Sequence, residues 1–298
     1  MLLTVTIDLM LPYWGDPDLL FRTVDSVRAQ TDGRWRLTIL DDAYPDPRVA
    51  EHFAQEQDAR IRYERRDANA GIVANFRKSV QQATADHLVV LGSDDLLEPG
   101  YIAHIHDVLT RHPEADIIQP GVVVIGADGE PVAPLVDRIK GLIAPRTDRG
   151  EVELHGEALA ASLIRGNWLY WPSLVFRREA IARHDFRDDL PIILDLAILL
   201  DLVFDGATLV ATGKPVFRYR RHRASASQTS LLSGRRFDDE RRFYRETASR
   251  AAAAGWPTAA RAARARVLSR LHAVTELPRV LRHGSADGRR AAVRHVLR

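Results

Sequence analysis

Residues 87–95 read HLVVLGSDD, a short apolar run that ends in two adjacent aspartates. The four apolar residues 88–91 predict a strand buried on both faces, because the run does not alternate as a half-exposed strand does. In open α/β sheets, ligands bind where the strands end. Asp94 and Asp95 would repel each other there unless a positive group lies beside them. A divalent cation that bridges the phosphates of a ligand meets that need.

The same two aspartates have a simpler interpretation. A solvated turn would also place them there, with Asp95 as the N-cap of a helix that Pro99 opens. For an isolated Asp-Asp pair, this capping arrangement is the more common one. The rest of the chain has to decide between the two interpretations.

The composition is typical of a folded cytoplasmic protein. Of the 298 residues, 46% are hydrophobic, which is enough for a sizeable core. Cysteine is absent, which excludes disulfides and thiolate metal sites and fits a reducing compartment. The first eleven residues lack a basic segment and include Asp8, so they predict a strand rather than a signal peptide. The longest apolar stretch, Ile192–Phe204, contains two aspartates and is too short to cross a bilayer.

Positive charge is concentrated at the C-terminal end. The formal net charge is +2, yet residues 251–298 carry ten arginines against Glu276 and Asp287. Such a segment predicts an anionic partner, either the surface of a membrane at its inner face or a polyanion. A solvated helical face rich in arginine and alanine is an equally good interpretation. We expect no specific nucleic-acid partner.

Strand and helix patterns alternate through the first half of the chain, which predicts βαβ units and a mainly parallel sheet. The expected strands are 3–11, 35–40, 61–64 and 88–91, and the expected helices are 17–30, 47–57, 72–83 and 99–111. Further along we expect strands at 116–125, 173–176 and 207–211, helices at 157–165 and 194–202, an irregular segment at 133–151 and a basic loop at 217–227. From residue 235 the pattern is helical, with breaks near Gly255 and Pro257 and near Pro278 and Gly284.

A second pair of aspartates follows another predicted strand. Asp41-Asp42 ends the strand at 35–40, just as Asp94-Asp95 ends the strand at 88–91. Parallel strands of one sheet place both pairs along the same edge. Two such pairs indicate a polyanion with a metal ion, or a nucleoside whose N–H and hydroxyl groups need acceptors.

Several segments, taken in order, resemble the sequence pattern of family 2 glycosyltransferases, which have the GT-A fold. The resemblance extends over about residues 4–228. Its segments are Pro12–Gly15, Ser26 with Gln30-Thr31, Leu40–Asp46, Asn69 and Gly71 with Asn75 and Ala83, Leu91–Asp95 with Pro99 and Tyr101, Pro172–Arg178, Leu194–Ala197, and Tyr219–Ser227.

The resemblance implies an α/β fold of the GT-A type, a Rossmann-like and mainly parallel sheet flanked by helices, over residues 1–230. A basic helical extension follows over residues 231–298. The implied function is that of an inverting glycosyltransferase, which moves a sugar from a nucleotide-diphosphate sugar, with UDP-sugars favoured, to an acceptor hydroxyl. The acceptor would be a glycan, a lipid-linked molecule or a small metabolite.

The resemblance also implies roles for single residues. Asp195 would deprotonate the acceptor hydroxyl, and its apolar neighbours would raise its pKa toward the working range. Asp95, together with Asp94, would hold Mn²⁺ or Mg²⁺, because all-oxygen ligation suits these ions. The residues implied in binding the nucleotide-sugar are Pro12, Trp14, Asp42, Asn69, Gly71, Ser93, Asp94, Arg220 and His222, and those implied in binding the acceptor are Asn167, Trp168 and Trp171.

The sequence departs from the family pattern at several positions. Gly15 replaces the usual asparagine, and Ala43-Tyr44 replaces the usual Gly-Ser. Gly92 occupies the place of the first aspartate, so that only Asp94 and Asp95 remain as carboxylates. The departures near the expected base are Leu194 and Ala197, which replace acidic residues and leave Asp195 alone.

Each assigned role has a structural alternative. Trp14 would be an ordinary core residue, since aromatic side chains are usually buried. Asp195 would cap the helix that follows it, and His222 would be a surface histidine in a basic loop. The aromatic segment 167–171 would be core rather than a sugar-stacking surface. The substitutes for Asp195 as the base would be Asp188 and Asp189.

Two other classes of protein fit parts of the sequence. A sugar-1-phosphate nucleotidyltransferase shares the sheet plan, but it needs a glycine-rich basic loop after the first strand, where this chain has Pro12–Asp16. A protein that binds a nucleotide-sugar or a polyanion without turnover would also account for the acidic edge and the arginine-rich end.

Overall fold

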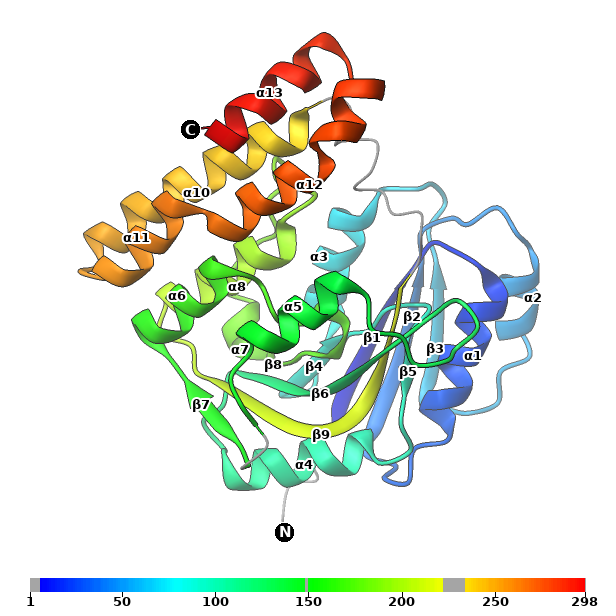
Figure 1. The fold of residues 1–298 in the computed structure, drawn as a ribbon. Helices are drawn as coiled ribbons and strands as arrows, with labels where there is room; N and C mark the ends of the chain where they lie inside the picture. Colours follow the sequence, from blue (N-terminus) through cyan, green and yellow to red (C-terminus); the bar gives the residue numbers. More distant parts are fainter. Residues whose placement is uncertain (1–5, 148–149, 222–233, 298) are drawn as a thin grey trace.

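The strands within residues 7–220 form one twisted sheet, and helices cover both of its faces (Figure 1). The computed structural model describes residues 6–147, 150–221 and 234–297. The strands are β1 (Ile7–Tyr13), β2 (Trp35–Asp41), β3 (Ile61–Arg65), β4 (His87–Val90), β5 (Leu96–Leu97), β6 (Ile117–Ile125), β7 (Val152–Leu154), β8 (Val175–Arg177) and β9 (Leu209–Arg220). The helices are α1 (Pro17–Arg28), α2 (Arg48–Phe53), α3 (Ile72–Gln82), α4 (Tyr101–Arg111), α5 (Leu135–Ile143), α6 (Gly156–Arg165), the 3₁₀ helix η1 (Trp171–Ser173), α7 (Arg178–Ile181), α8 (Leu194–Phe204), α10 (Arg235–Ala253), α11 (Pro257–Ala265), α12 (Val267–His283) and α13 (Ala286–Leu297).

The sheet is mainly parallel, as predicted. Its strand order is β3-β2-β1-β4-β8-β6-β9-β5, with β7 paired to β9. Strands β1 to β4 pair in parallel, and so do β6 and β9. Because β8 is antiparallel to both β4 and β6, these two strands point the same way. The carboxyl ends of β1, β2 and β4 therefore meet at one edge.

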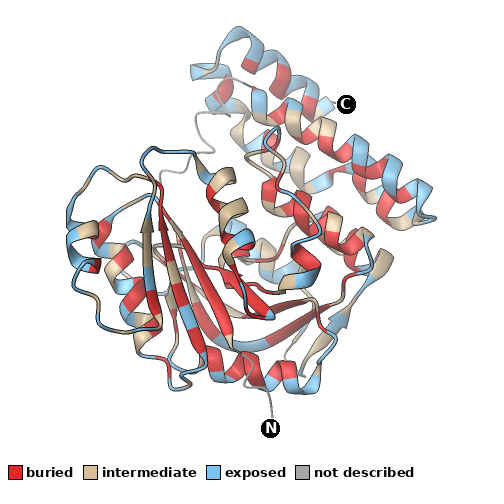
Figure 2. Ribbon diagram, turned by 180° about the vertical axis from the view of Figure 1, so that it is seen from behind, coloured by how far each residue is buried: buried red, intermediate tan, exposed pale blue. Residues whose placement is uncertain are grey.

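Strand β4 is buried on both faces, which confirms the interpretation of the apolar run. Leu88 and Val90 belong to the core on the side of α3, α6 and α8. Val89 and Leu91 belong to the core on the side of α1, α2 and α4. Figure 2 shows the resulting central band of buried residues. The strand is thus held on both sides up to the turn that carries Asp94.

The C-terminal helices form two layers. Helices α10 and α11 pack onto α6 and α8 and contribute Phe243, Tyr244 and Ala260 to the main core. Helices α12 and α13 form a smaller cluster with Phe237 of α10, outside that core. The predicted boundary at residue 230 lies outside the described residues. Within the described residues, no helix is both long and apolar enough to span a membrane.

Three predicted elements differ from the structure. Residues 133–151 are not irregular throughout, since they contain α5, whose apolar side chains Leu135 and Leu142 are exposed and form no inward stripe. Strand β9 continues to Arg220 into the predicted basic loop, because β6 and β5 both pair with it there. Helix α12 runs through Pro278, since Ala273 and Val280 on either side pack into the same cluster.

Candidate active site

A cleft of about 460 Å³ lies at the carboxyl ends of β1, β2 and β4. All predicted donor-binding residues up to position 94 are among the residues that line this cleft. The cleft is lined by Pro12, Tyr13, Trp14, Asp42, Asn69, Gly71, Ile72, Asn75, Phe76, Val90, Leu91, Gly92, Ser93, Asp94, Trp171 and Pro172. These strands are buried on both faces, and this burial holds their ends in place. The strand ends in turn form the walls of the cleft.

Asp42 holds one wall of the cleft in place. Its carboxylate accepts hydrogen bonds from the backbone N–H groups of Ala70, at 3.0 Å, and Gly71, at 2.8 Å. Gly71 has a φ of 85°, in the left-handed region that glycine adopts without strain, and α3 begins directly after it. Its neighbour Asp41 points elsewhere, accepting from Tyr44 N–H and the Tyr63 hydroxyl. Asp42 is therefore the member of the pair that faces the cleft.

Trp14 lies open in the cleft rather than in the core. Its side chain is 52% exposed, and its ring meets the edge of Tyr44 at a centroid distance of 5.2 Å. The interpretation of Trp14 as an ordinary core residue is therefore wrong. An exposed indole held by one aromatic neighbour leaves a face on which a planar ring could stack.

The two carboxylates of Asp94 and Asp95 lie in different places, one in the cleft and the other in the protein interior. Asp94 lines the cleft. Asp95 is buried, and its Oδ1 accepts a hydrogen bond from the backbone N–H of Arg220 at 2.8 Å. Within the described residues, its Oδ2 has no hydrogen-bond partner. Burial, and then the charge of Asp94, raise the pKa of Asp95 well above its usual range.

Asp95 is not the cap of a helix. Its bond reaches across to β9, while α4 begins at Tyr101 with Gly100 in the N-cap position. This geometry excludes the simpler interpretation of the aspartate pair for Asp95.

Gly92 makes room for the Asp95 carboxylate. A Cβ atom at position 92 would lie 2.2 Å from Asp95 Oδ2 and 3.1 Å from its carboxyl carbon. A side chain at this position would therefore compete with the Asp95 carboxylate for the same space. The departure from the family pattern at Gly92 is coupled to the inward placement of Asp95.

Arg220 ties β9 to this corner and does not line the cleft. Its side chain is buried, and Nε donates to the backbone carbonyl of Asp94 at 2.8 Å. Nη1 donates to the carbonyls of Gly126 and Ala127. These bonds give Arg220 a structural role, and its binding of the nucleotide-sugar stays a prediction. His222 lies outside the described residues.

The residues present can accommodate a divalent ion. Within the described chain, no group of three or more acidic or histidine side chains could hold a metal. Asp94 and the unpaired Oδ2 of Asp95 offer two carboxylates, however, and Mg²⁺-type ions often take one or two carboxylates plus phosphates and water. A cation here would offset the raised pKa of Asp95 and satisfy its buried oxygen.

Asp195 lies in the first turn of α8, where its carboxylate is partly buried. The side-chain amide of Asn167 donates to Asp195 Oδ2 at 3.1 Å. Burial raises the pKa of Asp195, against the smaller opposing effects of the Leu196 N–H, Lys140 and Asn167. The N-cap residue of α8 is Ile193, so the predicted capping role does not describe Asp195.

The two substitute bases lie on the surface. Asp188 pairs with Arg77, and Asp189 pairs with Arg187 and Arg242. Neither is among the residues that line the cleft, and Asp195 is not among them either. Ion pairs with arginine hold both side chains at the surface, and the hydrogen bond from Arg187 lowers the pKa of Asp189.

The aromatic segment 167–172 divides between two hollows. Trp171 and Pro172 line the cleft, and the Trp171 ring stacks on Phe76 at 5.8 Å between centroids. Trp168 is 4% exposed and lines a second pocket between α5, β6 and β9, called the α5 pocket below.

Ile72 and Phe76 of α3 also line the cleft, although the sequence interpretation did not select them. Both lie in the first two turns of the helix that begins after Gly71, and this position beside a predicted donor-binding glycine could have indicated them.

Comparisons with known proteins identify the family of this chain. The model of the family described as "Glycosyl transferase family 2" matches residues 8–162. The uncharacterized protein y4gI of Sinorhizobium fredii is 36% identical over 109 residues, which cover 36% of this chain and 12% of that protein. The putative glycosyltransferase EpsE of Bacillus subtilis is 26% identical over 133 residues, which cover 43% of this chain and 48% of EpsE. The matches thus span less than half of each relative.

A solved structure shares the fold. The crystal structure of S. aureus TarS residues 1–349 in complex with UDP-GlcNAc matches with a TM-score of 0.61 and 12% identity, and the match covers 81% of this chain and 66% of that one. Since the family model spans more than half of the chain, this protein belongs to glycosyl transferase family 2. The predicted family and the predicted GT-A fold are both confirmed.

Replacing Gly92 by alanine tests the link between positions 92 and 95. We expect Gly92→Ala to lower the free energy of unfolding by about 1–3 kcal/mol, the usual cost of overpacking, because the new methyl group must displace the Asp95 carboxylate. The measurement is urea denaturation followed by circular dichroism. Gly15→Ala is the matched control, since its nearest contact would be an ordinary 3.8 Å from Ser93 Oγ. Equal stability of the two variants would contradict the assigned role of Gly92.

Proposed function

We propose that this protein transfers a sugar from a nucleotide-diphosphate sugar to an acceptor hydroxyl by a single displacement that inverts the anomeric carbon. The observation that carries the proposal is the cleft at the strand ends, which brings together Trp14, Asp42 and Asp94. The family membership supports it, and so does the UDP-GlcNAc complex of the structurally similar TarS. A UDP-sugar is the donor we favour.

The nucleoside would occupy the side of the cleft near Trp14. The exposed indole offers a stacking face for the base. Asp42 already accepts two backbone N–H groups, yet a carboxylate has about four lone-pair sites, so it can accept one N–H of the base as well. Asn69, Gly71 and Ser93 complete this side, and Asp94 would lie near the ribose and diphosphate.

Asp94 and Asp95 would hold Mn²⁺ or Mg²⁺. When bound, the ion would act as a Lewis acid that stabilises the charge of the departing diphosphate. The unpaired Oδ2 of Asp95 supports this assignment, since a buried carboxylate oxygen without a partner is costly. Asp94, which faces the cleft, is the carboxylate that reaches a donor directly.

Asp195 would act as the general base. The Asn167 amide orients one carboxylate oxygen, and a raised pKa makes Asp195 a stronger base than an ordinary aspartate. The proton of the acceptor hydroxyl would move to Asp195 as the hydroxyl oxygen attacks the sugar from the face opposite the diphosphate. The bond between the sugar and the diphosphate breaks as the new glycosidic bond forms.

Asp195→Asn tests the base. We expect the rate of sugar transfer or donor hydrolysis to fall by about 10²–10⁴-fold, the usual contribution of a general base, with donor affinity unchanged.

For the unaltered protein, kcat/KM should fall as the pH drops through the raised pKa of Asp195, at a higher pH than an ordinary aspartate would give. The readout is release of nucleoside diphosphate from a panel of nucleotide-sugars. Near-normal turnover by Asp195→Asn would remove Asp195 from the mechanism, and donor binding without turnover on any acceptor would favour a binding protein.

A thermal-shift screen tests the donor and the metal together. We expect UDP or another nucleoside diphosphate to raise the melting temperature more with Mn²⁺ than without it, because ligands of the folded state stabilise it by mass action. Asp94→Asn and Asp95→Asn should each abolish this Mn²⁺-dependent increment. Asparagine retains an acceptor for the Arg220 N–H, which keeps the fold of the Asp95 variant comparable. An unchanged increment in both variants would show that the ion binds elsewhere.

We further propose that α12 and α13 bind an anionic membrane surface. On α12, Val267, Leu271, Val274 and Leu281 are exposed, and their spacing of four, three and seven residues places them on one face. Arginines are also exposed on these two helices, such as Arg282 on α12 and Arg289 on α13. Exposed apolar side chains together with basic ones are typical of helices that lie on anionic lipid.

Sedimentation with anionic vesicles tests this surface. Deleting residues 251–298 would remove core residues of α11, so point variants are needed. Leu271→Gln with Val274→Gln, and separately Arg282→Glu with Arg289→Glu, should each reduce binding to phosphatidylglycerol vesicles at least about tenfold. The matched control is Arg22→Glu with Arg183→Glu, which changes the net charge equally on exposed residues of the glycosyltransferase domain. Equal loss in the control would show nonspecific charge attraction.

A further inference from the structure

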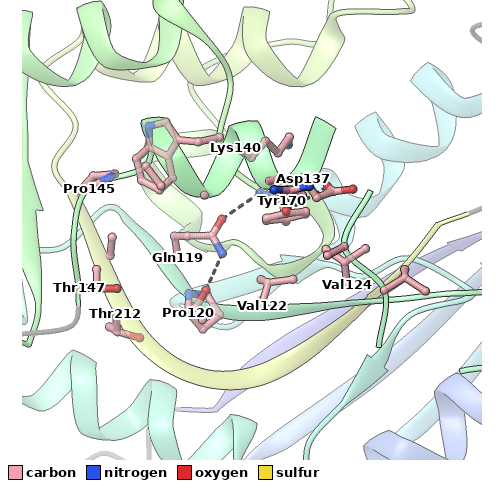
Figure 3. A pocket seen from close by; sticks show the side chains of 18 residues that line it. Gln119, Pro120, Val122, Val124, Asp137, Lys140, Pro145, Thr147, Tyr170 and Thr212 are labelled. Atoms are coloured by element: carbon pink, nitrogen blue, oxygen red, sulfur yellow. Dashed lines mark hydrogen bonds between the residues drawn. The ribbon is translucent and has the colours of Figure 1, made fainter. Parts of the chain in front are cut away.

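The α5 pocket is a second hollow, separate from the cleft, with a volume of about 350 Å³. In Figure 3, β6 supplies Gln119, Val122 and Val124 on one side, and α5 supplies Asp137 and Lys140 on the other. A volume of this order lies within the range of small-molecule sites. The remaining lining residues are Pro120, Gly121, Val132, Ala133, Arg138, Gly141, Ala144, Pro145, Thr147, Trp168, Tyr170, Ala211 and Thr212.

The pocket and its rim are largely apolar. Its interior includes Val122, Val124 and Pro145. At its rim, Val132 is 40% exposed. An apolar lining with an exposed apolar side chain at its mouth favours an apolar ligand that extends out of the pocket.

The charged groups in the lining leave an excess of positive charge. Asp137 is neutralised by Arg221, which donates two hydrogen bonds to its carboxylate at 2.9 and 2.8 Å. Lys140 Nζ donates to the Leu169 carbonyl at 2.7 Å and lies 4.4 Å from the centre of the Tyr170 ring. Within the described residues, neither Lys140 nor Arg138 forms an ion pair. Burial lowers the pKa of Lys140 to about 8, against the opposing charges of Asp195 and Asp137. An anionic group beside Lys140 would restore the stability of its charged form.

The segment 167–172 joins this pocket to the proposed reaction. Trp171 and Pro172 face the donor cleft, whereas Trp168 and Tyr170 face the α5 pocket. Asn167, at the start of the segment, donates to Asp195, and the Leu169 carbonyl accepts from Lys140. A molecule in the α5 pocket would therefore contact the same segment that orients the base.

We propose that the α5 pocket binds the acceptor, and that the acceptor is an amphipathic anion. Its apolar portion would fill the pocket between α5 and β6, its anionic group would lie near Lys140 and Arg138, and its hydroxyl would reach past Asn167 toward Asp195. This inference rests on the proposed transferase function, because it assigns the second substrate of that reaction.

The test measures binding of n-octyl phosphate by calorimetry in the absence of donor. Gly141 lines the pocket in the middle of α5, and a Cβ there would meet no atom within 4 Å, so Gly141→Phe fills the pocket without a clash at its first carbon. Gly100→Phe is the matched control, since Gly100 has the same open space but lines neither hollow. Melting temperature and UDP binding show that each variant is folded.

We expect n-octyl phosphate to bind more tightly than n-octanol or inorganic phosphate. Gly141→Phe should weaken its binding at least about tenfold, and Gly100→Phe should leave it unchanged. Lys140→Met should weaken binding of n-octyl phosphate about tenfold and leave binding of n-octanol nearly unchanged, as expected for loss of a charged hydrogen-bond donor.

Each contrary result overturns a defined part of the inference. Equal binding by Gly141→Phe and the unaltered protein would place the ligand elsewhere. Equal binding of n-octanol and n-octyl phosphate would remove the anionic group from the proposal. UDP binding without n-octyl phosphate binding would overturn the acceptor assignment alone, whereas n-octyl phosphate binding without any nucleotide binding would overturn the proposed transferase function.

Discussion

The buried carboxylate of Asp95 is the constraint around which the site is arranged. A carboxyl group withdrawn from water needs hydrogen-bond partners, and the backbone N–H of Arg220 supplies one of them. That bond joins the end of β9 to the turn after β4, although 125 residues separate them. The Arg220 side chain strengthens the junction by donating to the Asp94 carbonyl. The junction leaves Asp94 on the cleft wall, and it leaves one oxygen of Asp95 without a hydrogen-bond partner among the described residues, where we propose that a cation binds.

The second organising feature is the segment 167–172, which the sheet edge and the helices enclose. Trp171 closes the donor cleft by stacking on Phe76, and Asn167 orients Asp195 at the start of α8. The Leu169 carbonyl holds Lys140 of α5. This short segment therefore contacts both hollows and the residue that we propose as the base.

Much of this arrangement could be predicted because its signals are local. The unbroken apolar residues 88–91 determine a strand buried on both faces, and Asp16 followed by Pro17 determines the start of α1. Other features had no local signal. Helix α5 exposes Leu135 and Leu142, so its pattern did not resemble a helix packed on a core. The structural bonds of Arg220 had no local signal either, because nothing near it in the sequence reveals the carbonyls of Gly126 and Ala127 that it binds.

The sequence by itself determined most of the strands and helices, the family, and the edge at which the aspartate pairs gather, since apolar periodicity and strand ends depend on neighbouring residues. Only the tertiary structure decided which member of each pair faces the cleft. Asp42 and Asp94 line it, while Asp41 and Asp95 turn to partners that the fold brings from β3 and β9. It also decided that Trp168 and Trp171 serve different hollows. The physical reason is that hydrogen-bond partners and burial are set by contacts between distant segments, which form only when the sheet is assembled.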